Sequence, residues 1–329
     1  MRGVVRPMEL ARELADRGIV RLPNFLTAEE LEICQDSANE RFGSILRAML
    51  LKQVLRQTSG DAPLPTKFKE VVERDGGRLD VRHSILENPF STIHAAIEHS
   101  GLAETLSQLL GEDAELVAAG NVVAMSMEGW AQHVDTGENE VLADNLGAQA
   151  WHADGPHLFT TLPDTTLPAH AINIFIPLVD LTEENGPTEF AIGSHKLGHE
   201  YNDDDEEEVD GTSRVTSILA KAGDAILFDY RLWHRGLPNS SDTDRPMLYL
   251  VAARSFWRDD RNYSQGSSLF EQAASASSST AAASSAQPPA GERVPLLKRR
   301  PEVQQPAAEA AASGAESKRR GKRQRTGQT

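Results

Sequence analysis

The chain has little of several features that mark secreted or membrane proteins. Its 329 residues contain a single cysteine, Cys34, which excludes a disulfide within the chain and is typical of proteins from reducing compartments. No apolar run approaches the roughly 18 residues that a membrane-spanning helix needs. The first residues also lack the apolar core, about 7–15 residues long, of a secretory signal. We therefore expect an intracellular protein, cytoplasmic or nuclear, with no membrane partner.

Residues 263–329 lack the amino acids from which a core is built. Aromatic and β-branched residues are scarce there, and Ala, Ser, Gln, Pro and clustered Lys and Arg dominate. A segment of this composition cannot bury enough apolar surface to fold by itself. We therefore expect one folded domain over residues 1–262 and a disordered, Ala/Ser-rich and basic tail over residues 263–329.

Basic residues are outnumbered, and they gather at one end. The formal net charge is −16, but residues 291–329 hold ten Lys/Arg against four Asp/Glu, which is +6 and leaves −22 for the rest. Because nucleic-acid binding needs a positive face, the folded part should act on a small molecule instead. The basic clusters at 298–300 and 318–325 resemble nuclear-import signals or a nucleic-acid arm, so an import receptor or nucleic acid would bind only the tail.

An acidic run covers residues 203–208, DDDEEE. Like charges at this density repel one another and stay solvated, which favours a mobile surface loop. The alternative is that the run borders the active site and favours a cationic substrate.

Periodicity divides the folded part into two regions. Residues 1–110 are mainly helical, with helices expected at 8–17, at 28–49 after a capping box of Thr27 and Glu30, and at 91–110, and with a short strand at 19–22. After residue 111, short apolar runs at 116–123, 171–177, 225–228 and 247–253 alternate with Gly, Asn, Asp and Pro. The pattern predicts an α+β fold in which an antiparallel sandwich or jelly roll, over about 111–262, encloses a ligand cavity.

A histidine and an aspartate stand two residues apart in the stretch 150–155, AWHADG. On a strand, His152 and Asp154 would point to the same face. Two histidines and one carboxylate around open coordination positions are typical of iron(II) oxygenases, and His234, expected at the end of a strand, is our third candidate ligand. His133 and Asp135 have the same spacing, so the motif alone does not choose between the pairs.

A basic residue suited to a dicarboxylate follows. Arg245 lies eleven residues after His234, across a turn and at the start of an apolar run. Adjacent antiparallel strands would bring it near the cavity, where a planar guanidinium can hold a carboxylate through two parallel hydrogen bonds. On spacing alone, a surface charge after a turn is an equal alternative.

Together these residues resemble the phytanoyl-CoA dioxygenase family of iron(II)/2-oxoglutarate oxygenases, whose pattern is His-x-Asp, a distal His, and Arg about eleven residues later. Three more blocks agree: 18–27 (GIVRLPNFLT), 173–186 (NIFIPLVDLTEENG) and 193–196 (GSHK). The resemblance covers roughly residues 10–256. It favours His152 and Asp154 over His133 and Asp135, because the family's motif precedes a glycine.

The resemblance implies a double-stranded β-helix (jelly roll, cupin-like) core. It implies that His152, Asp154 and His234 ligate Fe²⁺ and carry catalysis, and that Arg245 binds the far carboxylate of 2-oxoglutarate. With O₂, the co-substrate would yield succinate and CO₂ while a substrate is oxidised. Because Asp154 is a carboxylate, no position is vacated for a halide, so hydroxylation of a small molecule, or of a residue on a protein, is expected.

Two other functions fit parts of the pattern. One is a non-catalytic metal-binding β-barrel that acts as a nuclear interaction module through its basic tail. The other is a zinc hydrolase with the same three ligands, which leaves Arg245 without a purpose. The intact triad together with Arg245 favours the dioxygenase.

Further candidates flank the motif or lie on expected strands. Gln149, Asn173 and Thr188 are candidates for binding the co-substrate, because inward polar side chains at these positions would reach a cavity. Trp151 and His157 are candidates for contacting the substrate. The competing interpretations are a core tryptophan and an ordinary hydrogen-bonded histidine.

Overall fold

The structure is a computed structural model of the chain. It describes residues 6–51, 67–126, 128–129, 147–159, 167–197, 201, 214–259, 262, 267–270 and 292–297. The chain separates into two units, Met1–Lys298 and Arg299–Thr329, and every described residue belongs to the first. Among the described helices, none combines the length and the apolar character required to cross a membrane.

The described residues of the N-terminal third of the chain form four α-helices: α1 (Pro7–Arg17), α2 (Ala28–Leu51), α3 (Phe90–Ser100) and α4 (Leu102–Leu110). The expected capping box begins α2, since Glu30 N donates to Thr27 Oγ1 at 3.3 Å and Thr27 N donates to Glu30 Oε2 at 2.9 Å. The single helix expected over 91–110 is two helices. Gly101 takes a left-handed φ of 82° between them, which ends α3.

Two antiparallel sheets form the centre of the fold. The large sheet has the order β1-β8-β5-β10-β4-β3-β2, with β11 also paired to β4, and the small sheet has the order β7-β6-β9. The large sheet contains β1 (Ile19–Leu22), β2 (Val71–Arg74), β3 (Arg78–Arg82), β4 (Glu115–Ala124), β5 (Ala171–Pro177), β8 (Ala225–Asp229), β10 (Arg245–Ala253) and β11 (Val294–Pro295). The small sheet contains β6 (Thr188–Ala191), β7 (Val215–Ser217) and β9 (His234–Gly236), and a short 3₁₀-helix, Ser194–Lys196, follows β6.

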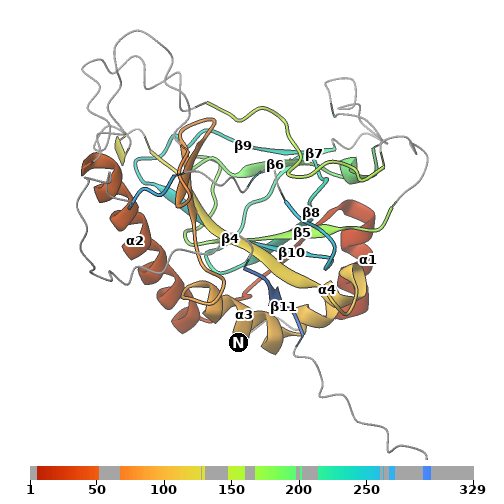
Figure 1. The fold of residues 1–329 in the computed structure, drawn as a ribbon. Coiled ribbons are helices and arrows are strands. Elements are labelled where there is room, and N and C mark those ends of the chain that lie inside the picture. Colours follow the sequence, from red (N-terminus) through yellow and green to blue (C-terminus); the bar gives the residue numbers. More distant parts are fainter. Residues whose placement is uncertain are drawn as a thin grey trace, which may run out of the picture. The chain divides into compact units, whose positions relative to one another are not determined.

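The large sheet is buried on both faces, which explains why its strands are apolar runs instead of alternating patterns. On one face, Ile172, Ile174 and Ile176 of β5 share a buried cluster with side chains from all four helices. On the other face, Phe228 of β8 packs against Phe190 of the small sheet, with ring centroids 5.1 Å apart. Figure 1 shows the small sheet above the large sheet and the helices below and beside it.

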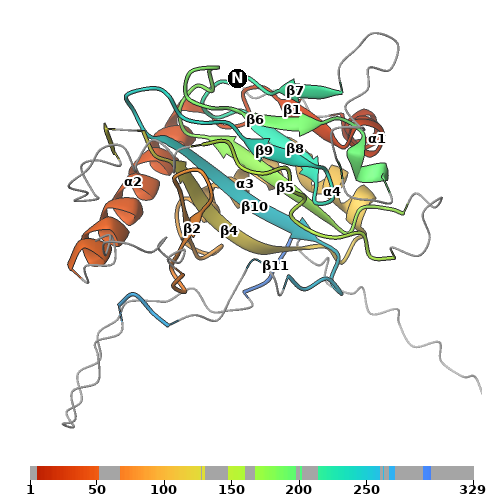
Figure 2. The same cartoon turned by 90° about the horizontal axis from the view of Figure 1, so that it is seen from above.

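The connectivity identifies the architecture. Going along the chain, β5 is in the large sheet, β6 and β7 are in the small one, β8 returns to the large one, β9 to the small one and β10 to the large one. This alternation between two facing sheets, also visible from above in Figure 2, is a double-stranded β-helix. The α+β prediction and the core that the resemblance implied are confirmed.

Two parts of the fold differ from the sequence-based expectation. Strands β2 and β3 lie inside the region expected to be mainly helical, where they form a hairpin across Gly76 and Gly77 and extend the large sheet beyond β4. Beyond residue 262, where we expected only a disordered tail, β11 pairs with β4, and Leu269 and Leu296 are each 1% exposed. A few apolar residues in a polar segment therefore suffice for docking on an existing sheet.

Candidate functional site

The two halves of the His-x-Asp…His pattern are brought together by backbone pairing. Residues 149–155 run antiparallel to residues 230–236, and His152 and His234 exchange both backbone hydrogen bonds, at 3.0 and 2.9 Å. His152 lies in an isolated bridge and not in the regular strand that we expected. His234 begins β9, whereas the sequence suggested that it ends a strand. The extended backbone still directs His152 and Asp154 toward the same region.

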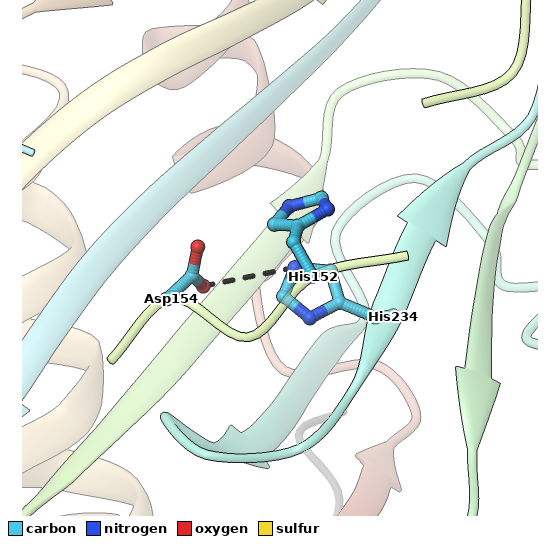
Figure 3. Close-up of side chains that lie close together, drawn as sticks. All are labelled: His152, Asp154 and His234. Carbon is cyan, nitrogen blue, oxygen red and sulfur yellow. Dashed lines mark ion pairs between the residues drawn. The ribbon is translucent and has the colours of Figure 1, made fainter. Parts of the chain in front are cut away.

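Three side chains converge between the sheets (Figure 3). One ligand atom from each of His152, Asp154 and His234 lies within 4.8 Å of the other two. His234 Nε2 lies 3.7 Å from Asp154 Oδ2, and the centroids of the two imidazole rings are 4.4 Å apart. Two imidazoles and one carboxylate at this spacing can surround one divalent ion.

Both histidines are oriented to offer the same nitrogen. His152 Nδ1 lies 2.8 Å from Ala150 O, and His234 Nδ1 lies 2.9 Å from Leu232 O. A carbonyl oxygen only accepts, so each Nδ1 carries the hydrogen and each Nε2 keeps its lone pair for a metal. Burial lowers the pKa of His234 to about 4, although Asp154 opposes the shift. The ring is therefore neutral near pH 7, as a metal ligand must be.

Asp154 is held by two asparagines. Asn173 Nδ2, on β5, donates to Asp154 Oδ2, and Asn262 Nδ2 donates to the backbone oxygen of Asp154 at 3.0 Å. Asn173 was predicted to bind the co-substrate, and the structure places its amide on the candidate metal ligand. Nothing in the sequence pattern pointed to Asn262, which is the last residue of the folded domain that we expected and belongs to none of the motifs.

The triad opens into a cavity of about 440 Å³ between the two sheets. Its lining includes the triad and four other predicted site residues: Gln149, Asn173, Thr188 and Arg245. Apolar surface comes from Val72, Val122, Phe175 and Met247, and the rings of Tyr230 and Tyr249 also face the cavity. The space suits a small organic ligand.

Arg245 is the first residue of β10 and is only 3% exposed. Its Nε donates to Asn185 O at 3.1 Å, and among the described residues it forms no ion pair. Burial, followed by the nearby charge of Arg78, lowers the pKa of Arg245 to about 9. A buried cation without a carboxylate partner is costly unless an anionic ligand compensates it.

Arg78 is a second buried cation in the lining of the cavity, and it was not predicted from the sequence. It lies on β3, is 1% exposed, and donates to the carbonyl oxygens of Asp75, Gly76 and Leu237 at 3.1, 2.8 and 2.6 Å. Burial lowers its pKa to about 10. The signal that could have revealed its strand is Asp75-Gly76-Gly77, a hairpin turn between two short apolar runs.

The remaining predicted residues divide between the cavity and the outside. Gln149 Oε1 accepts a hydrogen bond from Gly236 N at 3.1 Å, so this side chain braces β9 as well as facing the cavity. Trp151 stacks under Arg235 at 4.6 Å and packs edge-on to Tyr201. Trp151 and His157 are not among the residues that line the cavity, and their expected contact with the substrate stays a prediction.

Several sequence features lie outside the described residues. They are the competing pair His133 and Asp135, the acidic run 203–208 and the two basic clusters of the tail.

The match to a known protein family agrees with this geometry. The model of the family Phytanoyl-CoA dioxygenase (PhyH) matches residues 14–247, which contain the triad, Arg78 and Arg245. The chain belongs to the phytanoyl-CoA dioxygenase family. It is an iron(II)- and 2-oxoglutarate-dependent dioxygenase that uses O₂, as the sequence resemblance implied.

Curated relatives of this dioxygenase come from fungi. Dioxygenase hkm4 of Aspergillus hancockii is 27% identical over 250 residues, which are 74% of this chain and 70% of that protein. The iron/alpha-ketoglutarate-dependent dioxygenase ausO of Aspergillus calidoustus is 30% identical over 112 residues, 32% of this chain and 36% of its own length. Among solved structures, EctD from S. alaskensis with 2-oxoglutarate and 5-hydroxyectoine is 18% identical at a TM-score of 0.49, covering 77% of this chain and 83% of that one.

Proposed function

We propose that the dioxygenase holds iron(II) through His152, Asp154 and His234 and hydroxylates a small molecule bound in the cavity of about 440 Å³. The observation that carries this proposal is that the triad shares one cavity with Arg245, which is buried and has no ion pair among the described residues. The triad alone would suit several metals and reactions. A buried guanidinium beside it adds a requirement for an anionic co-substrate.

Arg245 is the proposed partner of the far carboxylate of 2-oxoglutarate. A guanidinium offers two parallel N–H donors that match a carboxylate, and among the described residues only the Nε of Arg245 donates to the protein. Arg78, on β3 of the same sheet and separated from β10 by β4, adds a second positive charge to the cavity wall. Thr188 and Gln149 line the cavity near these residues and complete the proposed co-substrate site.

Bound iron and 2-oxoglutarate would supply the activation of O₂, with one oxygen atom entering succinate as CO₂ leaves and the other entering the substrate as a hydroxyl group. The protein's own part is to orient the metal-binding side chains and to exclude water from the reacting region. Nδ1 hydrogen bonds fix both imidazoles, Asn173 fixes the carboxylate, and the apolar walls keep the reacting region dry. Because Asp154 keeps its place in the donor set, a halide has no vacated position, which supports hydroxylation.

The two alternative functions account for fewer of the residues that line the cavity. A zinc hydrolase would use the three ligands but would leave two buried guanidinium groups facing a cavity without an anion. A non-catalytic nuclear interaction module would rest on the basic tail, which lies outside the described residues. The small-molecule substrate, an intracellular location and binding of an import receptor or nucleic acid by the tail stay predictions from composition.

A titration tests the proposed function. Metal-free protein is mixed anaerobically with iron(II) and 2-oxoglutarate, the metal-to-ligand charge-transfer absorption is recorded, and succinate is measured after air is admitted. Wild-type protein should show the absorption and slow succinate formation without substrate, and His152→Ala should show neither. Zinc-dependent hydrolysis of esters, with no succinate, would contradict the proposal.

A further inference from the structure

The chain after β10 returns to the active site. We define the C-terminal strap as the described residues 254–259, 262 and 267–270. Its far end is anchored at β2, where Ser268 Oγ donates to Glu70 Oε1 at 2.5 Å and Leu269 N donates to Glu70 Oε2 at 2.8 Å. Its near end is anchored by Trp257, whose ring packs 4.2 Å from the ring of His170. Between these anchors lies Asn262, which lines the cavity.

Asn262 connects the strap to the loop that carries the motif. Its Nδ2 group lies 3.0 Å from the backbone oxygen of Asp154, 3.2 Å from Tyr230 Oη and 2.9 Å from Asp259 Oδ2. Its own backbone oxygen accepts a hydrogen bond from Arg82 Nη2 on β3, and its backbone N donates to Asp259 Oδ1 at 2.9 Å. One residue thus ties together the motif loop, the residue after β8 and strand β3 of the large sheet.

The amide of Asn262 is occupied by the protein itself. Two hydrogens serve three acceptors, all of them protein oxygens, so this group has no donor left for a substrate. Tyr230 donates its hydroxyl hydrogen to Asp259, which keeps the phenol turned toward the same cluster. The contacts of Asn262 therefore bear on where Asp154 sits.

We propose that Asn262 is a positioning residue for Asp154, and that the C-terminal strap is a working part of the active site although the family match ends at residue 247. Asp154 is thus braced at its side chain by Asn173 of β5 and at its backbone oxygen by Asn262 of the strap. This inference rests on the proposed role of Asp154 as an iron ligand. Partners of this kind that orient metal ligands change metal affinity by about 10–100-fold when they are removed.

Cobalt(II) binding tests the inference without turnover. Metal-free wild type and Asn262→Leu, which keeps the size of the side chain and removes both amide hydrogens, are titrated with cobalt(II) while the visible absorption is followed. Asn262→Leu should bind about 10–100-fold more weakly and show an altered d–d spectrum, which reports the ligand geometry. A loss of stability alone would move neither quantity in the folded protein.

Asn239→Leu is the matched control. Asn239 is buried and, like Asn262, donates its amide hydrogens to protein oxygens, the carbonyls of Ala124 and Thr243, each at 2.9 Å, but it does not line the cavity. Its variant should unfold at lower temperature and bind cobalt(II) as the wild type does. If Asn262→Leu does not fold, Asn262→Ser takes its place in the comparison.

The outcomes separate the two proposals. Unchanged cobalt(II) affinity and spectrum in the Asn262 variant, with normal binding by the wild type, would overturn the positioning role and leave the proposed function intact. A wild type that binds neither cobalt(II) nor iron(II) would overturn the proposed metal site itself.

Discussion

His152 and His234 are joined through their backbones and not through their side chains. Each donates its N–H to the other's carbonyl oxygen, at 3.0 and 2.9 Å, although 81 residues separate them in the sequence. This backbone pairing places the centroids of the two imidazole rings 4.4 Å apart. The site is therefore preorganised by the chain, and replacing one side chain leaves the pairing in place.

The first prediction concerns these two histidines. His152→Ala should abolish metal-dependent succinate formation and leave the metal-free stability nearly unchanged, because the ring is partly exposed and the bridge is made of backbone atoms. His234→Ala should also lower the free energy of unfolding by about 2 kcal/mol, since this buried ring packs 5.7 Å from Phe190 and 5.0 Å from Phe228. Urea unfolding of the metal-free variants measures the difference. Equal losses of stability would contradict it.

The second prediction concerns the anion site. Arg245→Lys keeps a positive charge but loses the planar fork, and should raise the KM for 2-oxoglutarate about 10–100-fold, as loss of a charge-assisted hydrogen bond predicts. Arg78→Lys should act in the same direction. The control is Arg235→Lys, because Arg235 pairs with Glu189 at 2.8 Å outside the cavity lining. A KM that is unchanged in Arg245→Lys would remove the proposed co-substrate site.

The third prediction uses two glycines. A Cβ at Gly236 would lie 2.6 Å from Arg78 Nη2 and 2.7 Å from Gln149 Oε1, so Gly236→Ala must displace cavity side chains. We expect at least about a tenfold rise in the KM for 2-oxoglutarate, the factor that corresponds to about 1.4 kcal/mol. A Cβ at Gly147 meets nothing within 4 Å, so Gly147→Ala should behave as wild type. Steady-state succinate assays over a range of 2-oxoglutarate concentrations compare the two variants.

The fourth prediction concerns acid stability. Burial lowers the pKa of His170 from its usual 6.5 to about 4, and neither ring nitrogen has a hydrogen-bond partner among the described residues. As the pH is lowered, His170 of the unfolded chain takes up a proton near pH 6.5 and His170 of the folded chain only near pH 4. The free energy of unfolding therefore decreases as the pH is lowered from 6.5 to 4. The slope from this one group is at most about 1.4 kcal/mol per pH unit.

His170→Phe tests that slope, because phenylalanine fills the same place without titrating. The free energy of unfolding of this variant, measured in urea at several pH values, should depend less on pH between about 6.5 and 4 than that of the wild type. His99→Gln is the control, since His99 is exposed near the end of α3. An unchanged slope in His170→Phe would show that this histidine is not buried in the neutral form.

Local sequence patterns predicted much of the fold. The capping box of Thr27 and Glu30 depends on residues three apart, and the strands β5 and β10 are continuous apolar runs, so both could be read along the chain. Strands β2 and β3 were not predicted, because four or five residues are too few to show whether apolar side chains alternate as they do in a strand. Trp151 was ambiguous for another reason, since the pattern does not say which face of an irregular segment meets the cavity.

Local sequence offered the groups that could meet a metal and an anion: two His-x-Asp pairs, His234 and Arg245. The family pattern then favoured His152 and Asp154 over His133 and Asp135. Only the tertiary structure brought Arg78 and Asn262 to the same cavity. Arg78 reaches it because β3 pairs with β4, and Asn262 reaches it because the strap is anchored at Glu70, 192 positions earlier in the chain. Contacts made by sheet pairing and docking between distant segments leave no periodic trace in the local sequence, so their chemistry appears only when the chain is folded.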